Sequence, residues 1–167
     1  MVKHKKVTLK FNNEPNDLSN VIAYSNASFD SPSCGRCIIL IGNDVIQCSA
    51  HRICRGVCSS LPADTFQLAN TTYMAFYCRQ LVSSFTKKLD IHIRFVTNSK
   101  SLIPTIETPA QSSLKEKRLI NDKNYSCDAV SINYCSLRLV KSVAMLADPL
   151  TTMNSPNSGL LLQTLEK

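Results

Sequence analysis

Residues 23–29 read Ala-Tyr-Ser-Asn-Ala-Ser-Phe, and residues 95–101 read Phe-Val-Thr-Asn-Ser-Lys-Ser. In each stretch an apolar, β-rich run reaches a single amide side chain, Asn26 or Asn98, and small polar residues follow. This pattern is typical of a β-strand that ends at a polar group. An asparagine at one strand end has an ordinary explanation, because its side chain satisfies neighbouring backbone groups.

The pattern outside these two stretches predicts a mixed α/β domain. Gly42-Asn43 separates two apolar runs and indicates a hairpin turn, and residues 63–85 have helical periodicity without glycine or proline. Pro104 and Pro109 limit any helix after the second quoted stretch. The predicted strands are residues 7–11, 20–27, 36–41, 44–49, 91–97 and 135–143, the predicted helices are 63–85, 115–127 and 158–166, and the predicted loops are 105–113 and 151–158.

Length and composition favour one intracellular domain. A chain of 167 residues with 44% hydrophobic content suits a single core. The net charge of +7 favours an anionic partner such as nucleic acid. No apolar run reaches the ~18–20 residues of a membrane span. The lysine-rich start lacks the apolar stretch of a secretory signal, so we expect the eight cysteines to be reduced thiols in the cytoplasm or nucleus.

Four segments carry a resemblance to a known family. They are Ile-Ala-Tyr-Ser-Asn-Ala-Ser at 22–28, Ser-Ser-Leu-Pro-Ala-Asp at 59–64, Val-Thr-Asn-Ser-Lys-Ser at 96–101 and Met-Leu-Ala-Asp-Pro-Leu-Thr at 145–151. In this order they resemble the ribonuclease H domain of copia-type long-terminal-repeat retrotransposon polyproteins. The resemblance implies a ribonuclease H-like α/β fold, with a mixed, mainly five-stranded sheet and flanking helices.

The same resemblance implies a domain plan and an ancestral activity. Residues 20–151 would be the ribonuclease H-like domain, residues 1–19 a basic strand and linker from the end of a reverse transcriptase connection, and residues 152–167 a tail with a short helix. The ancestral reaction would be metal-dependent hydrolysis of the RNA strand in an RNA–DNA hybrid. A reverse transcriptase would be a natural partner.

The resemblance also implies the site residues. Asn26, Asp64, Asn98 and Asp148 would occupy the four metal-carboxylate positions, with aspartate in the family where this chain has Asn26 and Asn98. Gln67 is an alternative to Asp64, because Gln67-Leu68-Ala69 resembles the Glu-Leu-x-Ala of cellular ribonucleases H.

Two of the four expected negative charges are therefore missing. Two-metal hydrolysis places two magnesium ions ~3.5–4 Å apart, and anionic ligands relieve their repulsion. An asparagine offers one neutral oxygen and a nitrogen that is a poor ligand for a hard cation. We therefore expect Asp64 and Asp148 to hold magnesium only weakly and hydrolysis to be impaired.

Other polar residues suggest substrate contacts or a different metal. Lys100 and Arg36 are candidate contacts to backbone phosphates of RNA or an RNA–DNA hybrid. The cysteine pairs Cys34/Cys37 and Cys54/Cys58, with His51, approach zinc-ribbon spacing, but the second pair is one residue too wide and the fold needs no such site. We therefore expect no zinc. His92 alternates with apolar neighbours, which indicates a half-exposed strand and not a catalytic base.

The sequence is compatible with three interpretations. The chain could bind RNA or a hybrid through its basic surface without cutting it, or it could be a domesticated domain that binds a protein such as a reverse transcriptase. A relic that folds poorly is the third. Nucleic-acid binding would weaken steeply with salt, whereas an apolar protein interface would not.

Overall fold

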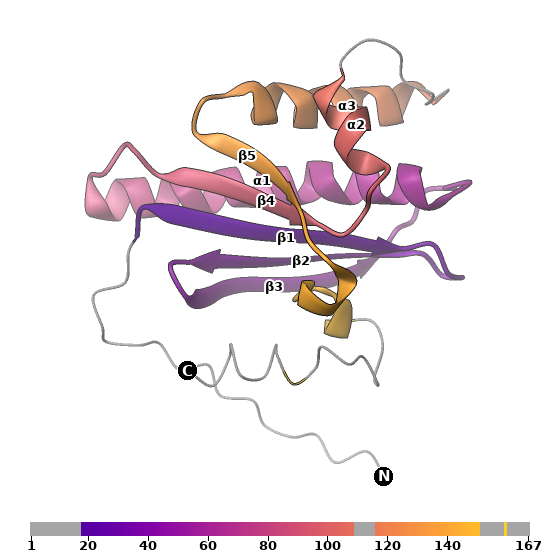
Figure 1. The fold of residues 1–167 in the computed structure, drawn as a ribbon, viewed down its shortest axis with the longest axis horizontal. Helices are drawn as coiled ribbons and strands as arrows, with labels where there is room; N and C mark the ends of the chain where they lie inside the picture. Colours follow the sequence, from indigo (N-terminus) through magenta and orange to yellow (C-terminus); the bar gives the residue numbers. More distant parts are fainter. Residues whose placement is uncertain (1–17, 109–115, 151–158, 160–167) are drawn as a thin grey trace.

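The computed structural model describes residues 18–108, 116–150 and 159 of the chain. Five strands form one sheet in the order β3-β2-β1-β4-β5 (Figure 1). The central strand β1 pairs antiparallel with β2 and parallel with β4, and β5 continues the parallel half. The sheet confirms the predicted mixed five-stranded architecture. The strands are β1 Asn20–Ser28, β2 Cys34–Ile41, β3 Asp44–Arg52, β4 His92–Thr97 and β5 Cys135–Leu139.

The hairpin between β2 and β3 forms where the sequence predicts it. Gly42 has φ of 60°, a left-handed conformation that glycine adopts without steric cost. The antiparallel register sets Cys34 opposite Arg52 and Cys37 opposite Ser49. Both strands are longer than predicted, so the open end of the hairpin, at Cys34 and Arg52, reaches the loop before the long helix.

Helices flank the sheet. They are α1 Ser60–Thr86, α2 Leu102–Glu107 and α3 Lys117–Ser131, and two short 3-10 turns follow β5 at Ser142–Ala144 (η1) and Asp148–Leu150 (η2). Pro62 lies in the first turn of α1, where its missing N–H is not needed. The helix ends at Thr86, and the N–H of the capping residue Lys87, which has a left-handed backbone, donates to the Ser83 carbonyl. None of the helices in the described part of the chain is long and apolar enough to cross a membrane.

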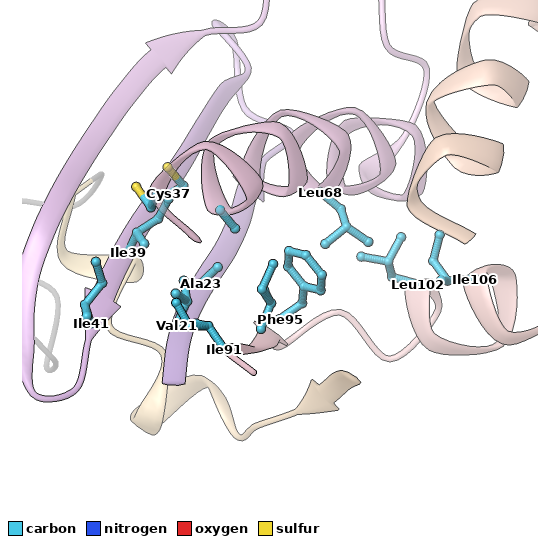
Figure 2. Close-up of a cluster of buried hydrophobic side chains, with 13 residues drawn as sticks. Val21, Ala23, Cys37, Ile39, Ile41, Leu68, Ile91, Phe95, Leu102 and Ile106 are labelled. Atoms are coloured by element: carbon cyan, nitrogen blue, oxygen red, sulfur yellow. The ribbon is translucent and has the colours of Figure 1, made fainter. Parts of the chain in front are cut away.

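The sheet buries apolar side chains on both faces. On one face, alternate residues of β1, β2 and β4 pack beneath α1 and α2, and Figure 2 shows Phe95, Leu68 and Leu102 meeting in this cluster. On the other face, Ile38, Leu40 and Val96 pack against the segment Met145–Ala147. This second cluster fixes the chain that leads into η2, and η2 begins at Asp148.

Apart from shifts of one to three residues at the ends of the other elements, three predicted elements differ from the structure, and three lie wholly or almost wholly outside the described residues. The strand predicted at 135–143 ends at Leu139, because β4 ends at Thr97 and the last bond across the pair joins the Val140 N–H to the Thr97 carbonyl. Residues 105–107, predicted as loop, complete α2. The helix predicted at 115–127 is observed as α3, which begins later and continues to Ser131. The predicted strand 7–11 and loop 151–158 fall outside the described residues, and of the predicted helix 158–166 only Gly159 is described, in a helical conformation.

Candidate functional site

The two amides lie at the same level of neighbouring strands. In the parallel pair β1/β4, Tyr24 stands beside Val96. Two residues further along each strand are Asn26 and Asn98, so the register aligns the two positions. Asn26 is buried, with 9% of its surface exposed, and Asn98 is partly exposed just beyond the end of β4. The sheet therefore brings the two predicted metal positions side by side.

Asn26 is tied to Asp148. The Asn26 Nδ2 group donates a short hydrogen bond to Asp148 Oδ1, across 122 residues of sequence. Asp148 is half-buried, and burial raises the pKa of its carboxyl, while the positive charge of Arg36 lowers it. An amide nitrogen can only donate to a carboxylate, so this contact uses a carboxylate oxygen that a cation would need.

Asp64 lies between the ends of β1 and β4. Asp64 is only 7% exposed, and hydrogen bonding from the Ser99 side chain and the Ala27 backbone lowers the pKa of its carboxyl. Burial raises the pKa of Asp64 to about 6, and the two hydrogen bonds only partly oppose that rise. The first turns of α1 thus bring a carboxyl to the strand ends that carry Asn26 and Asn98.

Gln67 lies elsewhere. It is 1% exposed, and its Nε2 group donates to the Thr71 hydroxyl at 3.3 Å. Its Oε1 atom packs so closely on Gly35 that a Cβ at that glycine would come within 2.0 Å of it. Gln67 therefore belongs to the contact between α1 and β2, and of the two alternatives it is Asp64 that contacts the residues next to Asn26 and Asn98.

Arg36 is not at the surface. It stands opposite Asn26 in the β1/β2 register, is 4% exposed, and donates to the Ser28 hydroxyl at 3.1 Å. Burial lowers the pKa of its guanidinium, and the negative charge of Asp148 is among the influences that raise it. The structure thus places Arg36 inside the site, close enough to Asp148 for their charges to interact, and this burial argues against the predicted contact to a backbone phosphate. Lys100 is exposed, two residues beyond Asn98.

The cysteines do not gather into a metal site. Cys37 is buried and lies 3.2 Å from the Ser49 hydroxyl, whereas Cys54 and Cys58 are exposed on the loop before α1. Across residues 18–108 and 116–150, no group of three or more His, Cys, Asp or Glu side chains could hold a metal ion. His92 and Arg94 are exposed on one face of β4 and Ile93 is buried on the other, which confirms the predicted half-exposed strand.

Sequence reasoning missed one contributor to the site, Ser99, and one close contact outside it, between Gly35 and Gln67. Ser99 bonds to Asp64, and its signal was its place as the first small polar residue after Asn98. Gly35 leaves the space that Gln67 fills, and no local pattern marks that role.

Comparison with known proteins identifies the fold. No protein-family model and no curated protein sequence matches the chain. Ribonuclease H1 from Halobacterium salinarum is 13% identical and superposes over 78% of this chain and 93% of its own with a TM-score of 0.56. LC11-RNase H1 in complex with an RNA/DNA hybrid is 14% identical over 78% of this chain and 92% of its own, also at 0.56. The prototype foamy virus protease-reverse transcriptase, 10% identical, covers 97% of this chain with 22% of its own length at 0.51. The chain has a ribonuclease H-like fold.

Proposed function

We propose that this chain is a ribonuclease H-like domain of copia-type retrotransposon origin that binds RNA–DNA hybrids but has lost most of its hydrolytic activity. The observation that carries this proposal is the hydrogen bond from Asn26 to Asp148. It joins two of the four positions that the resemblance assigns to metal ligands.

The residues present do not fit a two-magnesium centre. Magnesium takes hard oxygen ligands in octahedral geometry, and Asn26 turns its nitrogen, not its oxygen, toward Asp148. The positive charge of Arg36 acts on the same carboxylate and opposes a cation there. Asp64, with a pKa of about 6, also holds a proton more readily than an ordinary aspartate. Only two carboxylates therefore stand where the family has four.

Binding of a hybrid needs none of these carboxylates. Contacts to nucleic-acid backbones come mainly from lysine, arginine and small polar groups, and Lys100 is exposed beside the candidate site. The chain also carries a net charge of +7. The similar LC11-RNase H1 structure is a complex with an RNA/DNA hybrid, which supports the same class of ligand here.

The foamy virus likeness supports a reverse transcriptase as the setting of this domain. That neighbour is a protease-reverse transcriptase, and this chain corresponds to 22% of its length. In this proposal the domain works beside or joined to a reverse transcriptase, in the cytoplasm or nucleus where RNA–DNA hybrids are made.

Cleavage and binding of one labelled hybrid test the proposal together. The native chain and an Asn26→Asp/Asn98→Asp variant are compared in magnesium and in manganese, at two salt concentrations. We expect both proteins to bind with a steep salt dependence and only the double variant to cut. Cutting by the native chain at millimolar magnesium would contradict the loss of activity. A dissociation constant that does not change with salt concentration would contradict the proposal that the hybrid is the ligand.

A further inference from the structure

Helix α1 presents a row of large apolar side chains to solvent. Tyr73, Tyr77, Leu81 and Phe85 recur every four residues and are 66%, 53%, 40% and 84% exposed. Residues four apart lie on one side of a helix, so these four form a continuous ridge. The opposite side of α1 packs on the sheet through residues such as Leu68. The helix therefore has two apolar faces, of which the fold covers one.

The ridge has one charged neighbour on its own helix, and that side chain is already bonded. Among the 27 residues of α1, only Asp64 and Arg79 are charged. Asp64 is buried, and Arg79 donates to the carbonyls of Ile91 and Leu89 at 3.0 and 2.8 Å. A helix face that stays in water normally carries charged residues. This face has the composition of a contact surface.

A groove runs beside the ridge, between α1 and α3, which lie against each other. It has a volume of about 360 Å³, and Tyr73 and Tyr77 of the ridge form one of its walls. Tyr125 of α3 and Tyr134 line it from the other side, with Arg79 stacked 4.0 Å from the centre of the Tyr134 ring. One face thus offers both a ridge and a groove, which is the complementarity that helix packing uses.

We propose that a second copy of this chain covers this face, with the ridge of each copy in the groove of the other about a two-fold axis. Copies that each carry a net charge of +7 repel, and this face lowers that cost because its one charged side chain among the described residues, Arg79, is bonded to backbone carbonyls and stacked on Tyr134. Nucleic acid would instead need free cations here, and the arginine of this face is already bonded to backbone carbonyls.

The area is of the right order for a dimer. Aromatic side chains offer ~200 Å² each, so the exposed parts of Tyr73, Tyr77 and Phe85 amount to roughly 400 Å². Leu81 adds less than about 100 Å², and the groove walls are in part the same tyrosines, so the face offers roughly 500 Å² per partner, which suits a weak, concentration-dependent dimer. The ridge begins nine residues after Asp64, about 13 Å along the helix, so the dimer leaves the candidate site open.

Sedimentation velocity of the full chain from 1 to 100 µM tests this assignment. We expect the native chain to pass from monomer to dimer over this range, and Phe85→Glu and Tyr77→Glu to shift the transition at least tenfold upward in concentration. Val143→Glu is the matched control, because Val143 is 67% exposed but lies in η1, away from the ridge. Thermal unfolding by circular dichroism checks that each variant is folded, and Phe85→Glu, at the most exposed position, serves if Tyr77→Glu does not fold.

Two results would overturn the assignment. A native chain that stays monomeric at 100 µM is one, and a dimer that both ridge variants leave unchanged is the other. If the chain stays monomeric and instead forms a complex with a reverse transcriptase that Phe85→Glu and Tyr77→Glu both weaken, the face belongs to that partner and not to a second copy.

Discussion

Replacing Asn26 by aspartate turns the hydrogen bond with Asp148 into a pair of facing carboxylates. The Asn26 amide is the donor in this contact, and an ionised aspartate cannot donate. Asn26 is 9% exposed and Asp148 is half-buried, so water screens the new repulsion only in part. We expect Asn26→Asp to be less stable than the native chain at pH 7 when no divalent cation is present.

The size of the effect follows from the lost bond. A hydrogen bond to a charged group contributes about 1.5–3 kcal/mol, and repulsion between the carboxylates adds to the loss. For a domain of this size the fall in Tm is roughly 5–10 °C. The new pair shares a proton with a raised pKa in the folded state. The folded variant therefore binds more protons than the unfolded one, and its deficit grows as pH rises through that pKa and shrinks toward pH 4.

Differential scanning calorimetry at pH 4 to 8, with and without magnesium, measures both effects. Magnesium should raise the Tm of Asn26→Asp, because the cation binds the folded pair, and should leave the native chain unchanged. Asn124→Asp is the control, since it makes the same chemical change on the exposed side of α3. A variant within 1 °C of the native Tm at pH 7 would refute the view that this amide stabilises the site.

Three further predictions test the surroundings of the site. Gly35→Ala should lose about 1–3 kcal/mol in urea unfolding, because its Cβ would come within 2.0 Å of Gln67 Oε1, and Gly35→Ala/Gln67→Ala should recover part of the loss. Asp64→Asn should be more stable than the native chain at pH 7, because the pKa of Asp64 is raised to about 6 in the folded state and its deprotonation there costs stability. Between pH 4 and 6 the native chain should therefore lose stability as pH rises, by up to about 3 kcal/mol, and the variant should not. Arg36→Met should raise the pKa of Asp148 further, measured by carbon NMR of the carboxyl group, because it removes the charge that lowers that pKa.

Local patterns predicted the elements of the fold well. Alternation along β4 and the turn at Gly42 depend on neighbours in sequence, and both appear as predicted. The end of β5 depends instead on where its partner strand stops, which a local pattern does not contain. The sequence predicts no helix over residues 105–107 because Pro104 limits helix formation, but Pro104 lies in the first turn of α2, where a proline breaks no hydrogen bond.

The sequence predicted which residues form the candidate site but not the contacts that join them. Asn26 and Asn98 could be aligned because each pattern predicts a strand that ends near its asparagine, and the parallel register sets the two positions level. The bond between Asn26 and Asp148 could not be foreseen, since it depends on the second apolar cluster holding the segment before η2 against the sheet. The burial of Arg36 likewise follows from the β1/β2 register and not from its neighbours in sequence.

Under the proposed function, the amides explain why the fold persists without its chemistry. Four carboxylates at one sheet edge repel one another unless cations hold them, so a metal site costs stability when it is empty. An amide at Asn26 removes one negative charge and adds a hydrogen bond to Asp148. Once cleavage no longer matters, stability alone therefore favours asparagine at these positions. The apolar clusters on both faces of the sheet do not depend on the metal ligands, so the fold and its binding surfaces are kept when the hydrolytic activity is lost.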